Sequence, residues 1–159
     1  MKKELFETNP AKASNRLTIN SFMMGSVFFI FTLIWTLSPE RFSPIIIAQL
    51  VFSIPLLFVS SLAYSKIAYW KETKLWDSLG WFTNNIANIF LLNVVGLMVA
   101  QMFIHMALFY FGLIIFLMFI YSAINVIYKR NAFKEKLFKF LFIVAGLTFG
   151  GILPILGAY

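Results

Sequence analysis

The sequence predicts an all-α, polytopic integral membrane protein, in which a bundle of five transmembrane helices forms a single membrane domain over residues 1–159. The 159 residues are 61% hydrophobic and only 12% charged, whereas soluble domains carry about 25% charged residues. The stretch from Ser78 to Tyr128, 51 residues long, contains no acidic or basic side chain. As one helix it would be about 75 Å long. A bilayer has a hydrocarbon core of about 30 Å, so this stretch must turn back once.

Three further uncharged runs are each long enough for one span of about 20 residues. They cover residues 17–39, 42–65 and 140–159. With two spans in the long stretch, the sequence predicts a cytoplasmic tail over 1–17 and helices over about 18–37, 44–65, 80–101, 105–128 and 138–158. Asp77 and Ser78 are expected to cap the third helix, because their side chains accept hydrogen bonds from backbone N–H groups.

The distribution of Lys and Arg predicts the orientation of the chain, because cytoplasmic loops are enriched in these residues. The N-terminal tail, the second loop and the fourth loop hold 12 of the 13 Lys and Arg residues, and the first loop holds only Arg41. This alternation places the N-terminus in the cytoplasm and the C-terminus outside. We expect a bacterial or archaeal cell (inner) membrane.

The basic residues of the fourth loop are expected to contact anionic lipid headgroups at the cytoplasmic face. These residues are Lys129, Arg130, Lys134, Lys136 and Lys139. Residues 133–140 mix Phe and Leu with Lys, and this pattern favours a segment that lies along the inner leaflet before the fifth helix begins.

Five asparagines in the third and fourth spans are the main candidates for ligand binding or helix contact: Asn84, Asn85, Asn88, Asn93 and Asn125. All but Asn93 are predicted to share the cytoplasmic third of the membrane. Two interpretations stay open, namely hydrogen bonds between helices, worth about 0.6 kcal/mol each, or a polar vestibule that holds a ligand or water. Asn93 lies deeper, and we expect it to bond another helix, a second protomer or a bound molecule, because a buried amide without a partner costs about 1–3 kcal/mol.

Two further features have a structural and a functional interpretation. His105 lies at the predicted outer turn and is a candidate pH-sensitive group, because histidine changes charge near neutral pH. Its alternative role is to occupy the headgroup region. Gly146, Gly150 and Gly151 are predicted to be helix-packing residues, because small residues at a four-residue spacing let another helix approach closely. That helix belongs either to the same chain or to a second copy.

The residues that enzymes and ion-coupled carriers use are scarce in this chain. It has no cysteine and one histidine, which excludes thiolate and multi-histidine metal sites. All six carboxylates are assigned to loops or tails, whereas proton-coupled carriers need an ionisable group within the membrane. We therefore expect no catalytic residue, no metal, no cofactor and no nucleic-acid partner.

These observations favour a non-enzymatic integral membrane subunit or scaffold. It would act through intramembrane contacts of its helices with a second copy, as a homo-oligomer, or with another membrane protein. The alternative is a small channel- or transporter-like conduit, or a small-molecule or lipid binder, with an asparagine-lined site in the cytoplasmic half. Both interpretations stay open at the level of the sequence.

Overall fold

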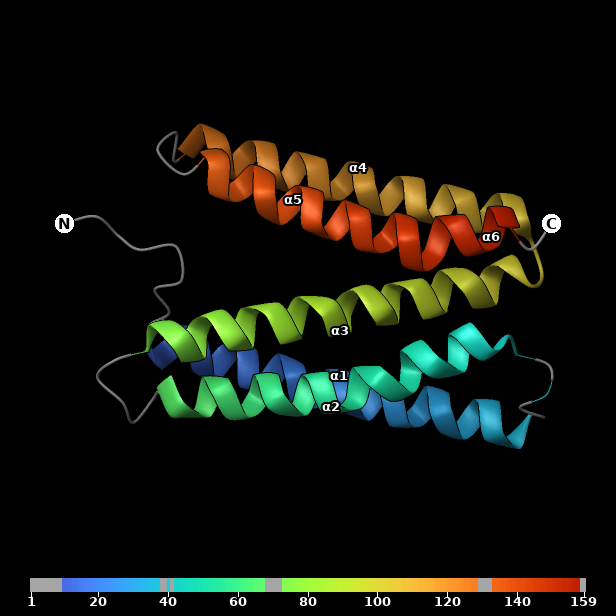
Figure 1. The fold of residues 1–159 in the computed structure, drawn as a ribbon, viewed down its shortest axis with the longest axis horizontal. Helices are drawn as coiled ribbons and strands as arrows, with labels where there is room; N and C mark the ends of the chain where they lie inside the picture. The colour runs from blue at the N-terminus through green and yellow to red at the C-terminus, as the bar shows by residue number, and fades with distance from the viewer. Residues whose placement is uncertain (1–9, 38–39, 41, 68–72, 129–132, 158–159) are drawn as a thin grey trace. The chain divides into compact units, whose positions relative to one another are not determined.

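The computed structural model describes residues 10–37, 40, 42–67, 73–128 and 133–157 (Figure 1). Within this part, 95% of the residues are helical and none lies in a strand. Five of the helices are long and apolar enough to cross a membrane. The predicted all-α class and the predicted five helices of spanning length are therefore confirmed.

The first four helices are α1 (Pro10–Thr36), α2 (Pro44–Ile67), α3 (Lys74–Ala100) and α4 (Ile104–Tyr128). The fifth segment of spanning length consists of α5 (Phe133–Leu147), the π-helical turn η3 (Thr148–Ile152) and α6 (Leu153–Gly157). The uncharged stretch from Ser78 to Tyr128 thus holds most of α3 and all of α4. A turn of three residues joins them, in which the N–H of Phe103 donates to Val99 O at 2.8 Å.

Helices α1 and α5 begin earlier than the sequence predicts. α1 starts at Pro10, so that the second half of the predicted tail is helical. Proline suits the first position of a helix, because its missing N–H would have no partner there and its φ angle is already helical. α5 starts at Phe133, so residues 133–140 form its first two turns. The expectation of a separate segment along the inner leaflet is therefore wrong.

The start of α3 also differs from the prediction. α3 begins at Lys74, and the carbonyl of Thr73 accepts the N–H of Asp77 at 2.8 Å. The prediction that Asp77 and Ser78 cap this helix is therefore wrong, because both lie inside its first turns. Oδ1 of Asp77 lies 3.5 Å from Nη1 of Arg16, on the neighbouring helix α1.

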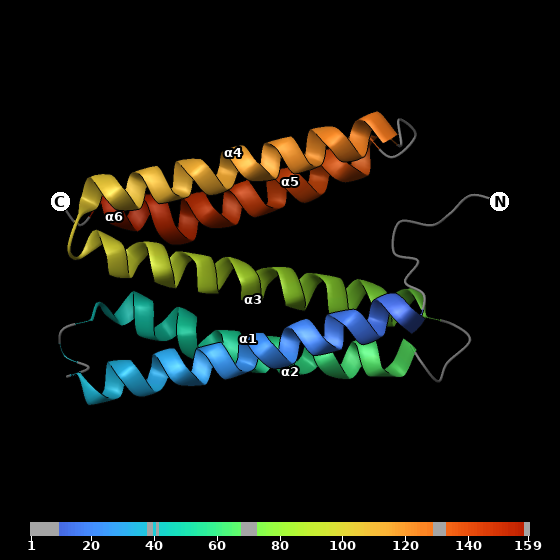
Figure 2. The same ribbon diagram turned by 180° about the vertical axis from the view of Figure 1, so that it is seen from behind.

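The chain divides into two compact units, which we call unit 1 (Met1–Leu91) and unit 2 (Leu92–Tyr159), with the boundary inside α3. In unit 1, α1 and α2 pack along each other (Figures 1 and 2). The fully buried residues of α1 recur every seven positions and are Ala13, Asn20, Val27 and Ile34. A seven-residue repeat is typical of helices that pack as a coiled coil.

In unit 2, α4 and α5 pack along each other (Figures 1 and 2). The core of this unit contains Phe111 from α4, Leu147 from α5 and Ile155 from α6, each at most 1% exposed. The last residues of α3 contribute Asn93 and Val94, which are fully buried. The single domain expected over residues 1–159 stays a prediction.

Candidate functional site

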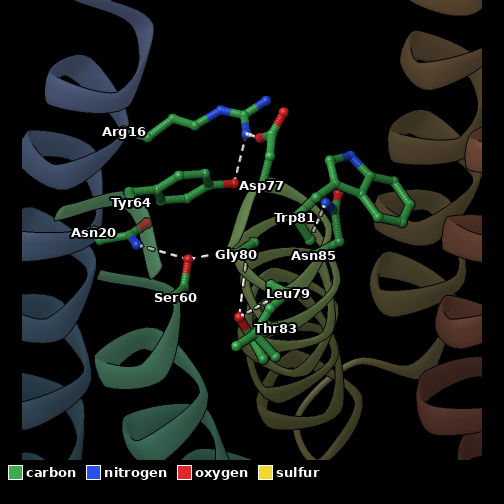
Figure 3. Close-up of polar contacts among 10 residues, drawn as sticks. All are labelled: Arg16, Asn20, Ser60, Tyr64, Asp77, Leu79, Gly80, Trp81, Thr83 and Asn85. Carbon is green, nitrogen blue, oxygen red and sulfur yellow. Dashed lines mark hydrogen bonds and ion pairs between the residues drawn. The ribbon is translucent and has the colours of Figure 1, made fainter. Parts of the chain in front are cut away.

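Three helices of unit 1 meet at Arg16, Tyr64 and Asp77, which we call the charged cluster (Figure 3). Arg16 of α1 donates through Nη1 to the hydroxyl of Tyr64 in α2 at 2.5 Å. The same nitrogen lies 3.5 Å from Oδ1 of Asp77 in α3. The Asp77 side chain is 2% exposed and that of Arg16 is 24% exposed, so the carboxylate lies inside the cluster and the guanidinium forms its outer side.

The aromatic ring of Tyr64 contributes a further contact to the charged cluster. The Cζ atom of Arg16 lies 4.8 Å from the centre of that ring, within the range of a cation–π interaction. Arg16 therefore meets both the hydroxyl and the ring of the same tyrosine. A lysine in its place would lack the planar fork that makes several such contacts at once.

A second polar layer joins the same three helices (Figure 3). The amide of Asn20 in α1 donates to the hydroxyls of Ser60 and Ser61 in α2 at 3.0 and 3.3 Å. The hydroxyl of Ser60 donates in turn to the carbonyl of Gly80 in α3 at 3.1 Å. Gly80 permits this close approach, because a Cβ atom there would lie 3.0 Å from Cε1 of Tyr64.

Sequence reasoning missed the charged cluster. It placed Arg16 in a tail and assigned all six carboxylates to loops or tails. The latter is wrong for Asp77 and Glu135, which lie within α3 and α5. One signal was present in the sequence. Arg16 directly precedes the first apolar run and Asp77 the third, and their charges are opposite. Two predicted spans that run in the same direction would start at the same face of a membrane, which would bring these residues close together.

Two of the five candidate asparagines bond to the helix that carries them. The Nδ2 atom of Asn85 donates to Trp81 O at 2.6 Å. The Nδ2 atom of Asn125 donates to Tyr121 O at 2.8 Å. Asn85 belongs to unit 1 and Asn125 to unit 2, and the membrane level predicted for them stays a prediction.

Asn84 and Asn88 lie one turn apart on α3, on the same side of the helix. Their Oδ1 atoms are buried and accept no hydrogen bond within the part of the chain that the structure describes. A buried carbonyl oxygen in this state costs about 1–3 kcal/mol. Oδ1 of Asn93, further along α3, is in the same state, so these are positions where a hydrogen-bond donor from outside the described residues would be favourable.

In unit 2, Asn93 and two glycines surround an aromatic ring. Asn93 is fully buried and donates through Nδ2 to Gly146 O at 3.3 Å, which links α3 to α5. The ring of Phe111 lies against Gly96 and Gly151, and a Cβ atom at Gly151 would come within 2.6 Å of its Cε1 atom. Gly150, the third predicted packing glycine, lies in η3.

The remaining predicted sites lie near helix ends. His105 is the exposed second residue of α4, and its role as a pH-sensitive group stays a prediction. Of the five predicted headgroup contacts, three lie in the first two turns of α5 and two lie outside the described residues. The three in α5 are Lys134, Lys136 and Lys139, and the two outside the described residues are Lys129 and Arg130.

In chemical terms, the charged cluster and the polar layer are interhelical contacts. Among the described residues, no group of three or more His, Cys, Asp or Glu side chains is placed to hold a metal ion. Comparison with known protein families, with curated proteins and with solved structures finds no match. The function of the chain is therefore inferred from its own residues and contacts.

Proposed function

We propose that the chain crosses a lipid bilayer five times, with its N-terminus in the cytoplasm and its C-terminus outside. The alternation of Lys and Arg supports this threading. The helices also leave large apolar side chains exposed, among them Phe22, Phe109 and Ile127, which are 74%, 69% and 76% exposed. Exposed apolar surfaces of this extent are rare on soluble monomers, whereas acyl chains accommodate them.

The orientation has a direct test. A tag at each terminus is probed from outside in intact cells. Only the C-terminal tag should be reachable. If both tags or neither tag were reachable, the proposed threading would be wrong. In this threading, Lys134, Lys136 and Lys139 lie at the cytoplasmic face, where each basic residue near an anionic surface gains about 1 kcal/mol.

Within the membrane, the chain acts as a non-enzymatic scaffold or subunit that associates with a second copy through α1. The observation that carries this proposal is an exposed row of small residues on that helix, which we call the small-residue face. It consists of Ser14, Thr18, Ser21, Gly25 and Thr32. The first four members follow steps of four, three and four residues, which let two helices pack side by side, and Thr32 lies seven residues after Gly25, with the exposed Phe28 between them. Small residues let transmembrane helices approach closely.

The contacts inside the chain leave this face available. The hydroxyls of Thr18, Ser21 and Thr32 donate to carbonyls of α1 itself, at 3.2, 3.0 and 2.9 Å. They therefore need no partner from α2 or α3. By contrast, Gly151 and Asn93, which lie on the contact surfaces expected from the sequence, already pack within unit 2.

Association is tested by reconstituting labelled protein in liposomes and measuring energy transfer over a range of protein-to-lipid ratios. We expect Gly25→Leu to weaken association about tenfold, which corresponds to about 1.4 kcal/mol. Gly112→Leu is the matched control, because a Cβ atom at either glycine would meet no described atom within 4 Å. A protein that remains monomeric at every ratio, or an equal effect of both variants, would overturn the proposal.

A second candidate function is a conduit or small-molecule binder in the cytoplasmic half, and it is favoured by the buried oxygens of Asn84 and Asn88. In this function they accept hydrogen bonds from a passing or bound donor, such as water or an amine. Asn84→Leu and Asn88→Leu should abolish flux into liposomes, whereas Asn85→Leu should preserve it, because its amide bonds its own helix. Absence of flux in the unmodified protein would exclude the conduit.

A further inference from the structure

The fifth spanning segment changes its winding at η3, where the N–H of Leu153 donates to Thr148 O, five residues earlier. Such a π-turn holds more residues than an α-turn and often occurs at functional sites. The sequence explains its position. Gly150 and Gly151 tolerate unusual backbone angles, and Pro154 lacks an N–H and would clash with the carbonyl four residues earlier in a regular α-helix.

The side chain of Asn93 lies against this turn, and only one of its two polar atoms has a hydrogen-bond partner among the described residues. Its Nδ2 atom donates to Gly146 O at 3.3 Å, a long hydrogen bond. Its Oδ1 atom is buried and accepts no hydrogen bond from the described residues. That oxygen faces Gly151, since a Cβ atom there would lie 2.7 Å from it. In this arrangement a buried acceptor therefore has no hydrogen-bond partner among the described residues, which is unfavourable.

Phe111 of α4 holds the same turn from another side. Its side chain is fully buried, and its ring fills the space that a side chain at Gly96 or Gly151 would occupy. The ring thus acts as a wedge between α3 and η3. Because both neighbours are glycines, the ring touches backbone on both sides, and movement of the turn requires the ring to withdraw or rotate.

We propose that η3 is a hinge at which α6 moves relative to α4, that Phe111 keeps it closed, and that Asn93 stabilises its open state. Opening a turn inside a membrane separates backbone N–H and C=O groups from their partners, which is unfavourable unless a side chain replaces those partners. A side-chain amide offers both a donor and an acceptor. In the open state Asn93 Oδ1 accepts a freed N–H of the turn, so the acceptor that is unmet in the closed state is satisfied.

The test uses pairs of spin labels, for which this cysteine-free chain needs no background substitution. Met106→Cys in α4 and Leu156→Cys in α6 span the hinge, and both side chains are exposed, at 63% and 56%. Met106→Cys with Leu141→Cys is the control pair, because Leu141 lies in α5 before the hinge. The distances between the two spin labels are measured by pulsed electron paramagnetic resonance on the full chain, with one chain in each nanodisc.

We expect two distances for the pair that spans the hinge and one for the control pair. Phe111→Leu should at least double the population of the second distance, because the smaller side chain no longer fills the space between Gly96 and Gly151. Asn93→Leu should reduce that population at least twofold, because leucine offers no partner to the freed backbone. Asn125→Leu should leave it unchanged, since its amide bonds its own helix.

A single narrow distance across the hinge, unaltered by Phe111→Leu, would overturn the proposal. Equal effects of Asn93→Leu and Asn125→Leu would overturn the role of Asn93. Variants are compared only if they keep the circular dichroism and elution volume of the unmodified chain. The hinge does not depend on self-association, because each nanodisc holds one chain, and its failure would leave the proposed role of α1 intact.

Discussion

In unit 1, polar side chains from three helices meet in one cluster, whereas in unit 2 an aromatic ring is set against two glycines. In unit 1, an arginine, a tyrosine and an aspartate from three helices meet in one cluster. In unit 2, Phe111 lies against the backbone of Gly96 and Gly151. In the proposed membrane threading, both arrangements would hold helices together where the hydrophobic effect contributes little, because lipid tails are as apolar as leucine.

The two kinds of helix contact are weakened by different kinds of substitution. A polar contact depends on the identity of both partners, because a charge left alone in a buried place is costly. A ring against glycine depends on shape, and it fails when atoms are added. Unit 1 should therefore respond most to the removal of one charge, and unit 2 to the enlargement of one glycine.

The largest expected effect is that of Asp77→Ala in unit 1. It leaves the Arg16 guanidinium without its carboxylate, and removing one partner of a fully buried pair costs about 3–5 kcal/mol. Because Arg16 is 24% exposed and water screens it in part, we expect a loss of about 2–3 kcal/mol in the free energy of unfolding. Detergent-induced unfolding, followed by tryptophan fluorescence, measures it.

The double variant Arg16→Met, Asp77→Leu is the control for this experiment. Replacing both charges by apolar side chains of similar size is often neutral, so most of the lost stability should return. If the double variant were as unstable as Asp77→Ala, the unpaired charge would not be the reason for the lost stability. Unit 1 would then not differ from unit 2 in its sensitivity to the removal of a charge.

In unit 2, Gly151→Leu should reduce the free energy of unfolding by about 1–3 kcal/mol, because overpacking forces the surrounding helices apart. The new side chain would collide with the Phe111 ring, since even a Cβ atom would lie 2.6 Å from its Cε1 atom. Gly112→Leu on α4 meets open space among the described residues and should not destabilise the protein. Stability that returns in Gly151→Leu, Phe111→Ala would assign the loss to this one contact.

The fold followed from the sequence because it rests on composition and length. A 51-residue stretch without charge can be accommodated in a membrane only as two helices, and the lengths of the other runs determine the remaining three. Helix ends were harder to predict. Arg16 looks like part of a tail in the sequence, but it lies within α1, and its side chain contacts Tyr64 of α2 and Asp77 of α3.

The charged cluster could not be derived in the same way. Arg16 and Asp77 each have an ordinary explanation in sequence, as a topology signal and as a helix cap. Only the packing of three helices reveals that they meet. The role of Gly151 was partly visible, because its spacing indicates close packing, but Phe111 had no distinguishing feature among 20 phenylalanines.

The smallest effect is expected for the polar layer of unit 1. Ser60→Ala removes one hydrogen bond to Gly80 O and one acceptor for Asn20. Each interhelical hydrogen bond in a membrane is worth about 0.6 kcal/mol, and Ser61 remains 3.3 Å from the same Asn20 amide. We expect the free energy of unfolding to fall by about 1 kcal/mol at most.

Ser65→Ala is the control for this variant, because the hydroxyl of Ser65 is exposed and donates to Leu62 O in its own helix. It should change the free energy of unfolding by less than about 0.5 kcal/mol, as most surface substitutions do. A Ser60→Ala effect no larger than that of Ser65→Ala would mean that the polar layer adds no measurable stability to unit 1. A clear difference would mean that the polar layer, about one helical turn along from the charged cluster, also stabilises the contact between the helices of unit 1.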